Sequence, residues 1–193
     1  MTAIFDKILA FHCAPALTGL KPANLFSYRK DSSSGIEPVI DDFNRKFNSL
    51  GLYIKKLCEC DRRYLFLVYN RTLSEENLLL PEKQALLERF GYTAESSLEE
   101  KLELLASRII SEHDFPHEIG LFLGYPIEDV TGFIRHSGKN YKFCGYWKVY
   151  GDVSQTCALF QSYTECRDHI CGQLCEGVSI HEAVINAHQT TKG

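Results

Sequence analysis

The sequence LYIKKLCECDRRYLFLVYN, from Leu52 to Asn70, decides the fold class of this 193-residue chain. Two runs rich in aliphatic and aromatic residues flank Asp61 and Arg62, an arrangement typical of a β-hairpin. The second run, RYLFLVYN, is apolar on both of its faces, which indicates a central strand that is covered on both sides. We therefore expect strands at 52–60 and 63–70.

Further strand and helix signals lie on both sides of this hairpin. ANLFSYR predicts a strand near 24–29, and NYKFCGYWKVYGD predicts a last strand or hairpin within 141–150. HCAPALTGLKP, residues 12–22, contains two prolines and one glycine and is expected to be an irregular loop. Ser97 and Glu100 match a capping box at the start of a helix. Apolar residues at helical spacing predict helical segments within 3–11, 36–51, 74–111, 153–175 and 179–187.

These elements together predict an α+β fold, in which helices wrap a small and mainly antiparallel sheet. The length of the chain fits a single domain spanning residues 1–193. The polar end AHQTTKG predicts a disordered tail from about residue 188.

Composition narrows the classes of function. The formal charge of -4 and the pI of about 6.0 argue against general nucleic-acid binding, which favours a basic protein. The longest apolar runs fall far below the roughly twenty residues of a membrane-spanning helix, and no basic segment of a signal peptide precedes the first apolar run. We therefore expect a cytoplasmic protein without membrane insertion, in which the eight cysteines are reduced.

A histidine pair occurs in SEHDFPHEIGLFLGYPIEDVTGF, residues 111–133, where His113 and His117 are four positions apart. Such a pair can bind a metal when both residues lie on one helix face. Pro116 lies between them, however, and proline starts a helix more readily than it continues one. The zinc-protease pattern also needs a histidine where Leu121 stands. We interpret the stretch as a joint between two helices and keep both histidines as candidate metal ligands.

The segment from Val130 to Gly151 contains no aspartate or glutamate, and it interleaves basic and aromatic residues. Such a mixture suits a flat anionic ligand, such as a nucleotide, a flavin, a porphyrin or a single-stranded nucleic acid. The alternative is an amphipathic strand whose rings face inward and whose lysines lie in water. The candidate ligand-binding residues are Arg135, Lys139, Lys142, Tyr146, Trp147 and Lys148.

Two further places could support chemistry. In the N-terminal loop, a thiol close to a basic side chain can act as a nucleophile, so that Cys13 and Lys21, joined by His117 and Glu118, are candidate catalytic residues. In the last long helix, Cys171 and Cys175 are four residues apart and could bind zinc or an iron–sulfur cluster together with ligands from elsewhere. The alternative for these cysteines is a helix edge of small residues.

Three motifs in this order carry a resemblance to a known family. CAPALTGLKPANLFSY, HDFPHEIGLFLGYPIEDVTGFI and GKNYKFCGYWKVYGD together resemble the domain-of-unknown-function family numbered 3793, which is found mainly in anaerobic Firmicutes. The resemblance implies a cytosolic protein of an anaerobic bacterium, and it implies no catalytic residues. Flavodoxin-like and iron-handling neighbours of the family favour a redox-linked or metal-linked role.

The sequence thus supports three hypotheses about function. The first is an accessory or binding protein. Its ligand would be an anionic cofactor or a small anionic ligand, or its partner would be a metal-linked or redox protein. The cofactor could be iron, haem, a flavin or none. The second is an enzyme that combines Cys13 or Lys21 with His117 and Glu118. The third is a structural subunit of a protein complex, which would expose a large apolar patch.

Overall fold

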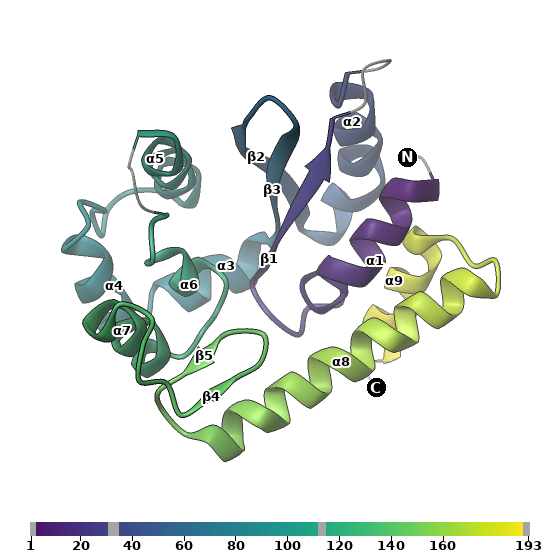
Figure 1. Cartoon of the computed structure of the whole chain (residues 1–193). Coiled ribbons are helices and arrows are strands. Elements are labelled where there is room, and N and C mark those ends of the chain that lie inside the picture. The colour runs from purple at the N-terminus through teal and green to yellow at the C-terminus, as the bar shows by residue number, and fades with distance from the viewer. Residues whose placement is uncertain (1–2, 31–34, 112–114, 191–193) are drawn as a thin grey trace.

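The computed structural model describes residues 3–30, 35–111 and 115–190. Its main sheet has three antiparallel strands in the order β1-β3-β2, with β3 at the centre (Figure 1). The strands are β1 (Ala23–Arg29), β2 (Leu52–Glu59) and β3 (Arg63–Asn70). The predicted hairpin and the central position of its second strand are both confirmed, and the fold is α+β.

Helices cover both faces of the sheet, as the apolar character of β3 predicted. Phe66 and Val68 belong to one buried cluster, whereas the alternate residues Leu67 and Tyr69 belong to another. Successive side chains of a strand point to opposite faces, so one strand anchors two cores.

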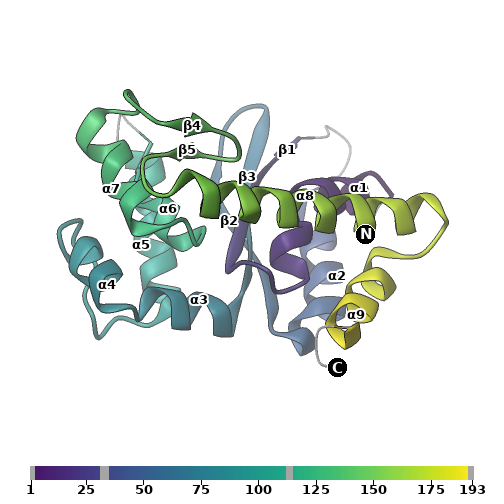
Figure 2. The same cartoon turned by 90° about the horizontal axis from the view of Figure 1, so that it is seen from below.

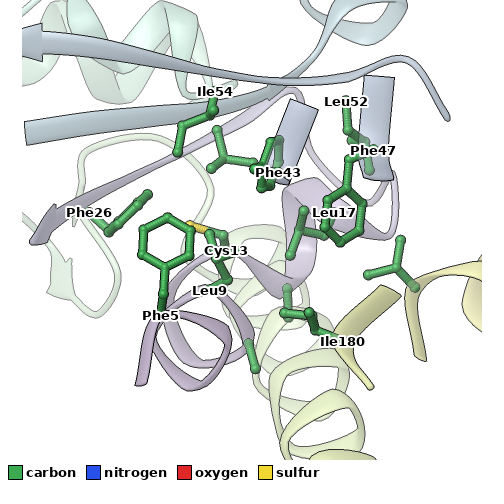
Figure 3. Close-up of a cluster of buried hydrophobic side chains, with 14 of the residues drawn as sticks. Phe5, Leu9, Cys13, Leu17, Phe26, Phe43, Phe47, Leu52, Ile54 and Ile180 are labelled. Carbon is green, nitrogen blue, oxygen red and sulfur yellow. The ribbon is translucent and has the colours of Figure 1, made fainter. Parts of the chain in front are cut away.

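The first cluster lies between the sheet and the two ends of the chain. Figure 3 shows its centre, where Phe5, Leu9, Phe26 and Phe43 pack together. Its helices are α1 (Ala3–Leu17), α2 (Glu37–Phe47), the short 3-10 turn η1 (Asn48–Leu50), the second half of α8 (Val153–Cys175), and α9 (Ile180–Thr190). Gly51, at φ 74°, ends the turn before β2 in the left-handed conformation that glycine favours.

The second cluster is covered by the helices between β3 and the β4–β5 hairpin (143–149). These are α3 (Arg71–Leu78), α4 (Pro81–Glu88), α5 (Leu98–Ser111), α6 (Ile119–Phe122) and α7 (Ile127–His136). The capping box at the start of α5 is confirmed, because the Ser97 amide donates to Glu100 Oε2 at 2.7 Å and the Glu100 amide donates to Ser97 Oγ at 3.2 Å.

The segment 141–150 forms a hairpin of two short strands, β4 (Phe143–Cys144) and β5 (Lys148–Val149). This hairpin makes a sheet of its own instead of joining the main sheet. It packs on the first half of α8, where Trp147 and Val149 meet Phe160 and Tyr163 in a third buried cluster. Seen from below, α8 runs from the hairpin past α1 towards α9 (Figure 2).

The prediction of an irregular loop at residues 12–22 was wrong for residues 12–17, which are helical. Helix α1 continues to Leu17, although Pro15 cannot donate a hydrogen bond to the carbonyl of Phe11. The small residues Cys13 and Ala14 and the larger Leu17 are fully buried on this helix, and this packing outweighs the missing bond. The chain then turns at Gly19, whose φ is 81°.

Helix α9 also extends further than expected, because it includes the residues from 188 to Thr190 in which we expected a disordered tail. Residues 191–193 lie outside the described part of the chain. Among the described residues, no helix is both long and apolar enough to cross a membrane.

Candidate functional site

Two adjacent cavities are lined by residues of α1, the start of β1, the α6–α7 connection, the β4–β5 hairpin and α8. The first, which we name the Lys21 cavity, has a volume of about 320 Å³. The second, the His117 cavity, has a volume of about 380 Å³. Both are lined by Leu25, Leu123, Tyr125 and Tyr146, so these four residues form the boundary that the two cavities share.

Lys21 is a buried cation at the first cavity. Its side chain is only 7% exposed, and its Nζ lies 5.2 Å from the ring centroid of Tyr125 and 5.4 Å from that of Tyr163. Within the described residues, no hydrogen-bond acceptor or carboxylate contacts this amine. Burial lowers the pKa of Lys21 to about 8, and the neighbouring Cys13 acts weakly in the opposite direction.

The other buried lysines of the described chain show how unusual this is. Lys83 is 6% exposed, and its amine donates to Asn77 Oδ1. Lys101 is 8% exposed, and its amine donates to the carbonyl of Ser96. Buried polar groups nearly always have such partners, because the loss of hydration must be compensated. The amine of Lys21 instead faces the rings of Tyr125 and Tyr163 and the cavity.

The chain fixes Lys21 at this place through a tight turn after α1. The backbone amides of Leu20 and Lys21 both donate to the carbonyl of Pro15, at 2.8 and 3.2 Å. One residue later, the carbonyl of Pro22 accepts from the Asn70 amide at 2.9 Å. The backbone of Lys21 is therefore held between the end of α1 and the end of β3, which limits where its side chain can go.

The rest of the Lys21 cavity is basic and aromatic, and none of its described lining residues carries a carboxylate. Arg167 of α8 contacts the cavity, and its guanidinium stands 5.2 Å from the ring centroid of Phe11. It also pairs with Asp168 at 2.8 Å, but that carboxylate is 62% exposed, so the pair is weak. Partial burial lowers the pKa of His12, which favours a neutral imidazole at pH 7.

An amide completes the set of polar groups. Asn24 Oδ1 accepts from the backbone amide of Ala16 at 3.0 Å, which ties the end of α1 to β1. Its Nδ2 group is therefore the part of the side chain that can donate to a ligand. With Lys21 and Arg167, Asn24 gives the cavity three donors to an anion from three different elements.

The His117 cavity is more apolar. The His117 ring packs edge-on against Phe133 at 4.8 Å, and Trp147 stacks on Tyr125 with centroids 4.3 Å apart. Lys148 is the basic residue of this lining, and its Nζ donates to the carbonyl of Gly138 at 2.7 Å. This cavity therefore suits the flat, apolar part of a ligand.

Asp129, which the sequence analysis missed, holds the hairpin against α7. It is 2% exposed, and its carboxylate accepts from Trp147 Nε1 at 2.6 Å and from the backbone amides of Tyr150 and Gly151 at 2.7 and 2.8 Å. The sequence carried only an indirect signal for this role of Asp129. The segment from Val130 to Gly151 contains no aspartate or glutamate, so a carboxylate that accepts from the indole of Trp147 must come from outside it.

The predicted ligand-binding residues are divided by the structure. Tyr146 lines both cavities, and Trp147 and Lys148 line the His117 cavity, where Trp147 is also part of the third buried cluster. The amine of Lys142 donates to the carbonyl of Gly151 at 2.8 Å and so closes the hairpin. Lys142, Trp147 and Lys148, three of the six, therefore stabilise the hairpin itself.

Two members of that predicted set stand apart. Arg135, at the end of α7, and Lys139, in the connection to the hairpin, are exposed and line neither cavity. A ligand in the two cavities would not contact them. Their role in binding stays a prediction.

The four candidate catalytic residues are also separated. Lys21 and His117 line neighbouring cavities, but Cys13 is fully buried in the first cluster (Figure 3), and burial raises the pKa of its thiol far above the usual range. Glu118 is 1% exposed and accepts from Arg108 Nε at 2.6 Å, which makes it part of a buried ion pair. Neither Cys13 nor Glu118 lines a cavity with Lys21.

The candidate metal ligands do not form a cluster in the part of the chain that is described. No three histidine, cysteine, aspartate or glutamate residues there are placed to hold one metal ion. Cys171 is half-buried against the first cluster and Cys175 is exposed, while His117 lies in the second cavity. His113 lies outside the described residues. All eight cysteines are free thiols.

The fold and the site define an α+β protein with a ring-lined, basic cavity beside an apolar one. The family model described as Protein of unknown function (DUF3793) matches residues 9–184, and the chain belongs to this family. No curated protein and no solved structure matches the chain significantly.

Proposed function

We propose that the protein binds a small organic anion with a flat, apolar body. The anionic group is held by the cationic lining of the Lys21 cavity, and the flat body extends between the tyrosine rings towards the His117 cavity. Of the ligand classes that the sequence suggested, flat anions such as flavins match this division into a basic end and an aromatic end.

The observation that carries this proposal is Lys21, a residue that is 7% exposed and whose amine lacks a hydrogen-bond acceptor among the described residues. A largely buried ammonium keeps little of its hydration, so an acceptor that replaces the remaining water in the cavity lowers its free energy. An anion in the cavity would supply that acceptor, with Arg167 and Asn24 within the same lining. Stacking on the rings of Tyr125, Tyr146 and Tyr163 would hold the flat body.

The setting that we infer for this binding is the reducing cytoplasm of an anaerobic bacterium, as the family resemblance implies. Eight free thiols in one chain support a reducing compartment. A metal-linked or redox protein is the partner that the same resemblance favours.

The test is isothermal titration of the full chain with 2-naphthoate, a flat anion, and with 2-naphthamide, its neutral counterpart. Lys21→Met keeps the apolar stem and removes the charge, and Lys83→Met is the matched control, because Lys83 is a buried lysine that lines neither cavity. Circular dichroism first establishes that each variant is folded.

We expect Lys21→Met to weaken the binding of 2-naphthoate by about tenfold or more, which corresponds to the loss of one charge-assisted hydrogen bond. Lys83→Met should bind 2-naphthoate as the unchanged protein does, and 2-naphthamide should bind both variants equally. Equal affinity of 2-naphthoate for Lys21→Met and the unchanged protein would contradict the proposal.

A further inference from the structure

We infer that Lys21 is a nucleophile that forms an imine with a small aromatic aldehyde carrying an anionic group. This inference rests on the proposed function, since the same cavity must first hold the anion. It adds a reactive group to the ligand class and a covalent step to the binding.

The geometry around the amine supports a reactive role. Lys21 Nζ lies 5.2 Å from the ring centroid of Tyr125 and 5.4 Å from that of Tyr163, and the backbone amide of Lys21 is fixed by a hydrogen bond to the carbonyl of Pro15. Among the described residues, no acceptor takes its protons in a hydrogen bond or an ion pair. A ligand entering the cavity therefore meets an amine that is positioned and not already engaged.

Burial also favours the reactive form of this amine. A lysine must be neutral to attack a carbonyl carbon, and desolvation in an apolar pocket is a recognised way to achieve this. With its pKa lowered to about 8, about one Lys21 side chain in ten is neutral at pH 7. An exposed lysine of ordinary pKa has a neutral fraction smaller by two to three orders of magnitude.

The anionic group of the ligand has a separate place. Arg167 and Asn24 line the same cavity from α8 and β1, while Lys21 comes from the turn between α1 and β1. An aldehyde whose anion is held by Arg167 and Asn24 leaves the Lys21 amine to meet its carbonyl, whereas an anion without a carbonyl can also pair with the Lys21 ammonium. This assignment requires a ligand with the anion and the carbonyl at opposite ends of a flat body.

The step balances without an oxidant or a reductant. The nitrogen lone pair of Lys21 forms a bond to the carbonyl carbon, and the carbonyl oxygen takes up a proton from the nitrogen to give a carbinolamine. The carbon–oxygen bond then breaks, the second amine proton leaves with the oxygen as water, and a carbon–nitrogen double bond remains. One amine and one aldehyde give one imine and one water.

The experiment incubates the full chain at pH 8 with 6-formyl-2-naphthoate and sodium cyanoborohydride, which reduces the imine to a stable amine, and maps the adduct by peptide mass spectrometry. We expect labelling at Lys21 to exceed that at any other lysine by about tenfold or more, in line with its larger neutral fraction. The amines of Lys83 and Lys101, which are buried but hydrogen-bonded, are the internal references.

A second ligand separates this inference from the proposed function. Titration with 6-(hydroxymethyl)-2-naphthoate, which has the same anion but no carbonyl, measures binding alone. Lys21→Arg keeps a cation but has no nucleophilic amine, so it should bind this compound and give no adduct at position 21.

The outcomes are distinct. If the hydroxymethyl compound binds and labelling at Lys21 is no greater than at exposed lysines, the imine inference is overturned and the proposed function stands. If neither naphthoate binds, both are overturned. Selective labelling of Lys21 together with binding of the hydroxymethyl compound supports both.

Discussion

Trp147 Nε1 donates a hydrogen bond to Asp129 Oδ2 at 2.6 Å, and both side chains are buried. The other oxygen of the same carboxylate accepts the backbone amides of Tyr150 and Gly151. A single side chain of α7 thus satisfies three donors of the hairpin segment. Because Trp147 stacks on Tyr125, which lines both cavities, this carboxylate also positions the wall of the candidate site.

We predict that Asp129→Ala destabilises the protein by about 2–4 kcal/mol, because it leaves buried donors without an acceptor. Urea unfolding measures this change, and the fluorescence of Trp147, the one tryptophan of the chain, should shift to longer wavelength in the folded state. Glu128→Ala is the control, since Glu128 is the exposed neighbour on the same helix turn. A change in stability within about 0.5 kcal/mol for Asp129→Ala would rule out this role.

We predict that Arg108→Met destabilises the protein by about 3 kcal/mol, because it removes the arginine partner of the buried Glu118 carboxylate. Chemical denaturation measures the loss, with Arg89→Met as an exposed control. Replacing both partners, in Arg108→Met with Glu118→Met, should restore part of the stability, since no charge is then left buried. If the double variant is as unstable as the sum of both single variants, the ion pair is not the cause.

We predict opposite effects for two glycine substitutions near and in α8. A Cβ at Gly145 would lie 2.5 Å from Phe160 Cδ2, so Gly145→Ala should force the hairpin away from α8 and cost about 1–3 kcal/mol. A Cβ at Gly172 meets no described atom within 4 Å, so Gly172→Ala should stabilise the helix by about 0.5–1 kcal/mol. Thermal unfolding of the two variants checks both signs at once.

We predict that Lys21→Met stabilises the protein at pH 7 and that this gain shrinks as the pH rises. The pKa of Lys21 is lowered to about 8 in the folded state, so the unfolded chain binds the proton more tightly and the buried cation costs stability at neutral pH. Between pH 7 and pH 9 the folded protein releases the proton, and the difference between the two proteins should decrease by about 1 kcal/mol.

Urea unfolding of both proteins at several pH values tests this prediction. The comparison of the two proteins is necessary because other titrating groups face the amine or its cavity. Burial raises the pKa of the Cys13 thiol and of the Tyr125 and Tyr163 phenols, and His12, Tyr146 and Arg167 complete the titratable lining. A gap between the two proteins that is constant from pH 7 to pH 9 would show that Lys21 keeps its ordinary pKa.

The sequence predicted those elements whose causes are local. The hairpin is encoded by two β-rich runs around a two-residue turn, and α8 begins at Val153 as expected, since Asp152 caps it by accepting from the Gln155 amide at 3.0 Å. The course of α1 past Pro15 could not be read in this way, because the packing that sustains it comes from distant segments. Local signals alone favoured a loop.

The candidate site was predicted only in part, for the same reason. Lys21 and His117 were candidates by residue type, and they line adjacent cavities, but nothing near Lys21 in the sequence shows that two tyrosines from remote segments enclose its amine. The basic and aromatic segment from Arg135 to Lys148 suggested a single binding surface. Two of its four basic residues, Lys142 and Lys148, instead donate to backbone carbonyls around the hairpin.

The length of α8 has a consequence for how the protein opens. Its 23 residues span about 35 Å and pack against the hairpin through Phe160 and against the α1 core through Ile170, with Arg167 at the cavity between them. Unfolding at either end of the molecule would therefore expose α8, whose buried residues also stabilise the cluster at the other end. The backbone amides in the middle of α8 should exchange with deuterium only in global unfolding, and an anion in the Lys21 cavity should slow that exchange on both sides of Arg167 together.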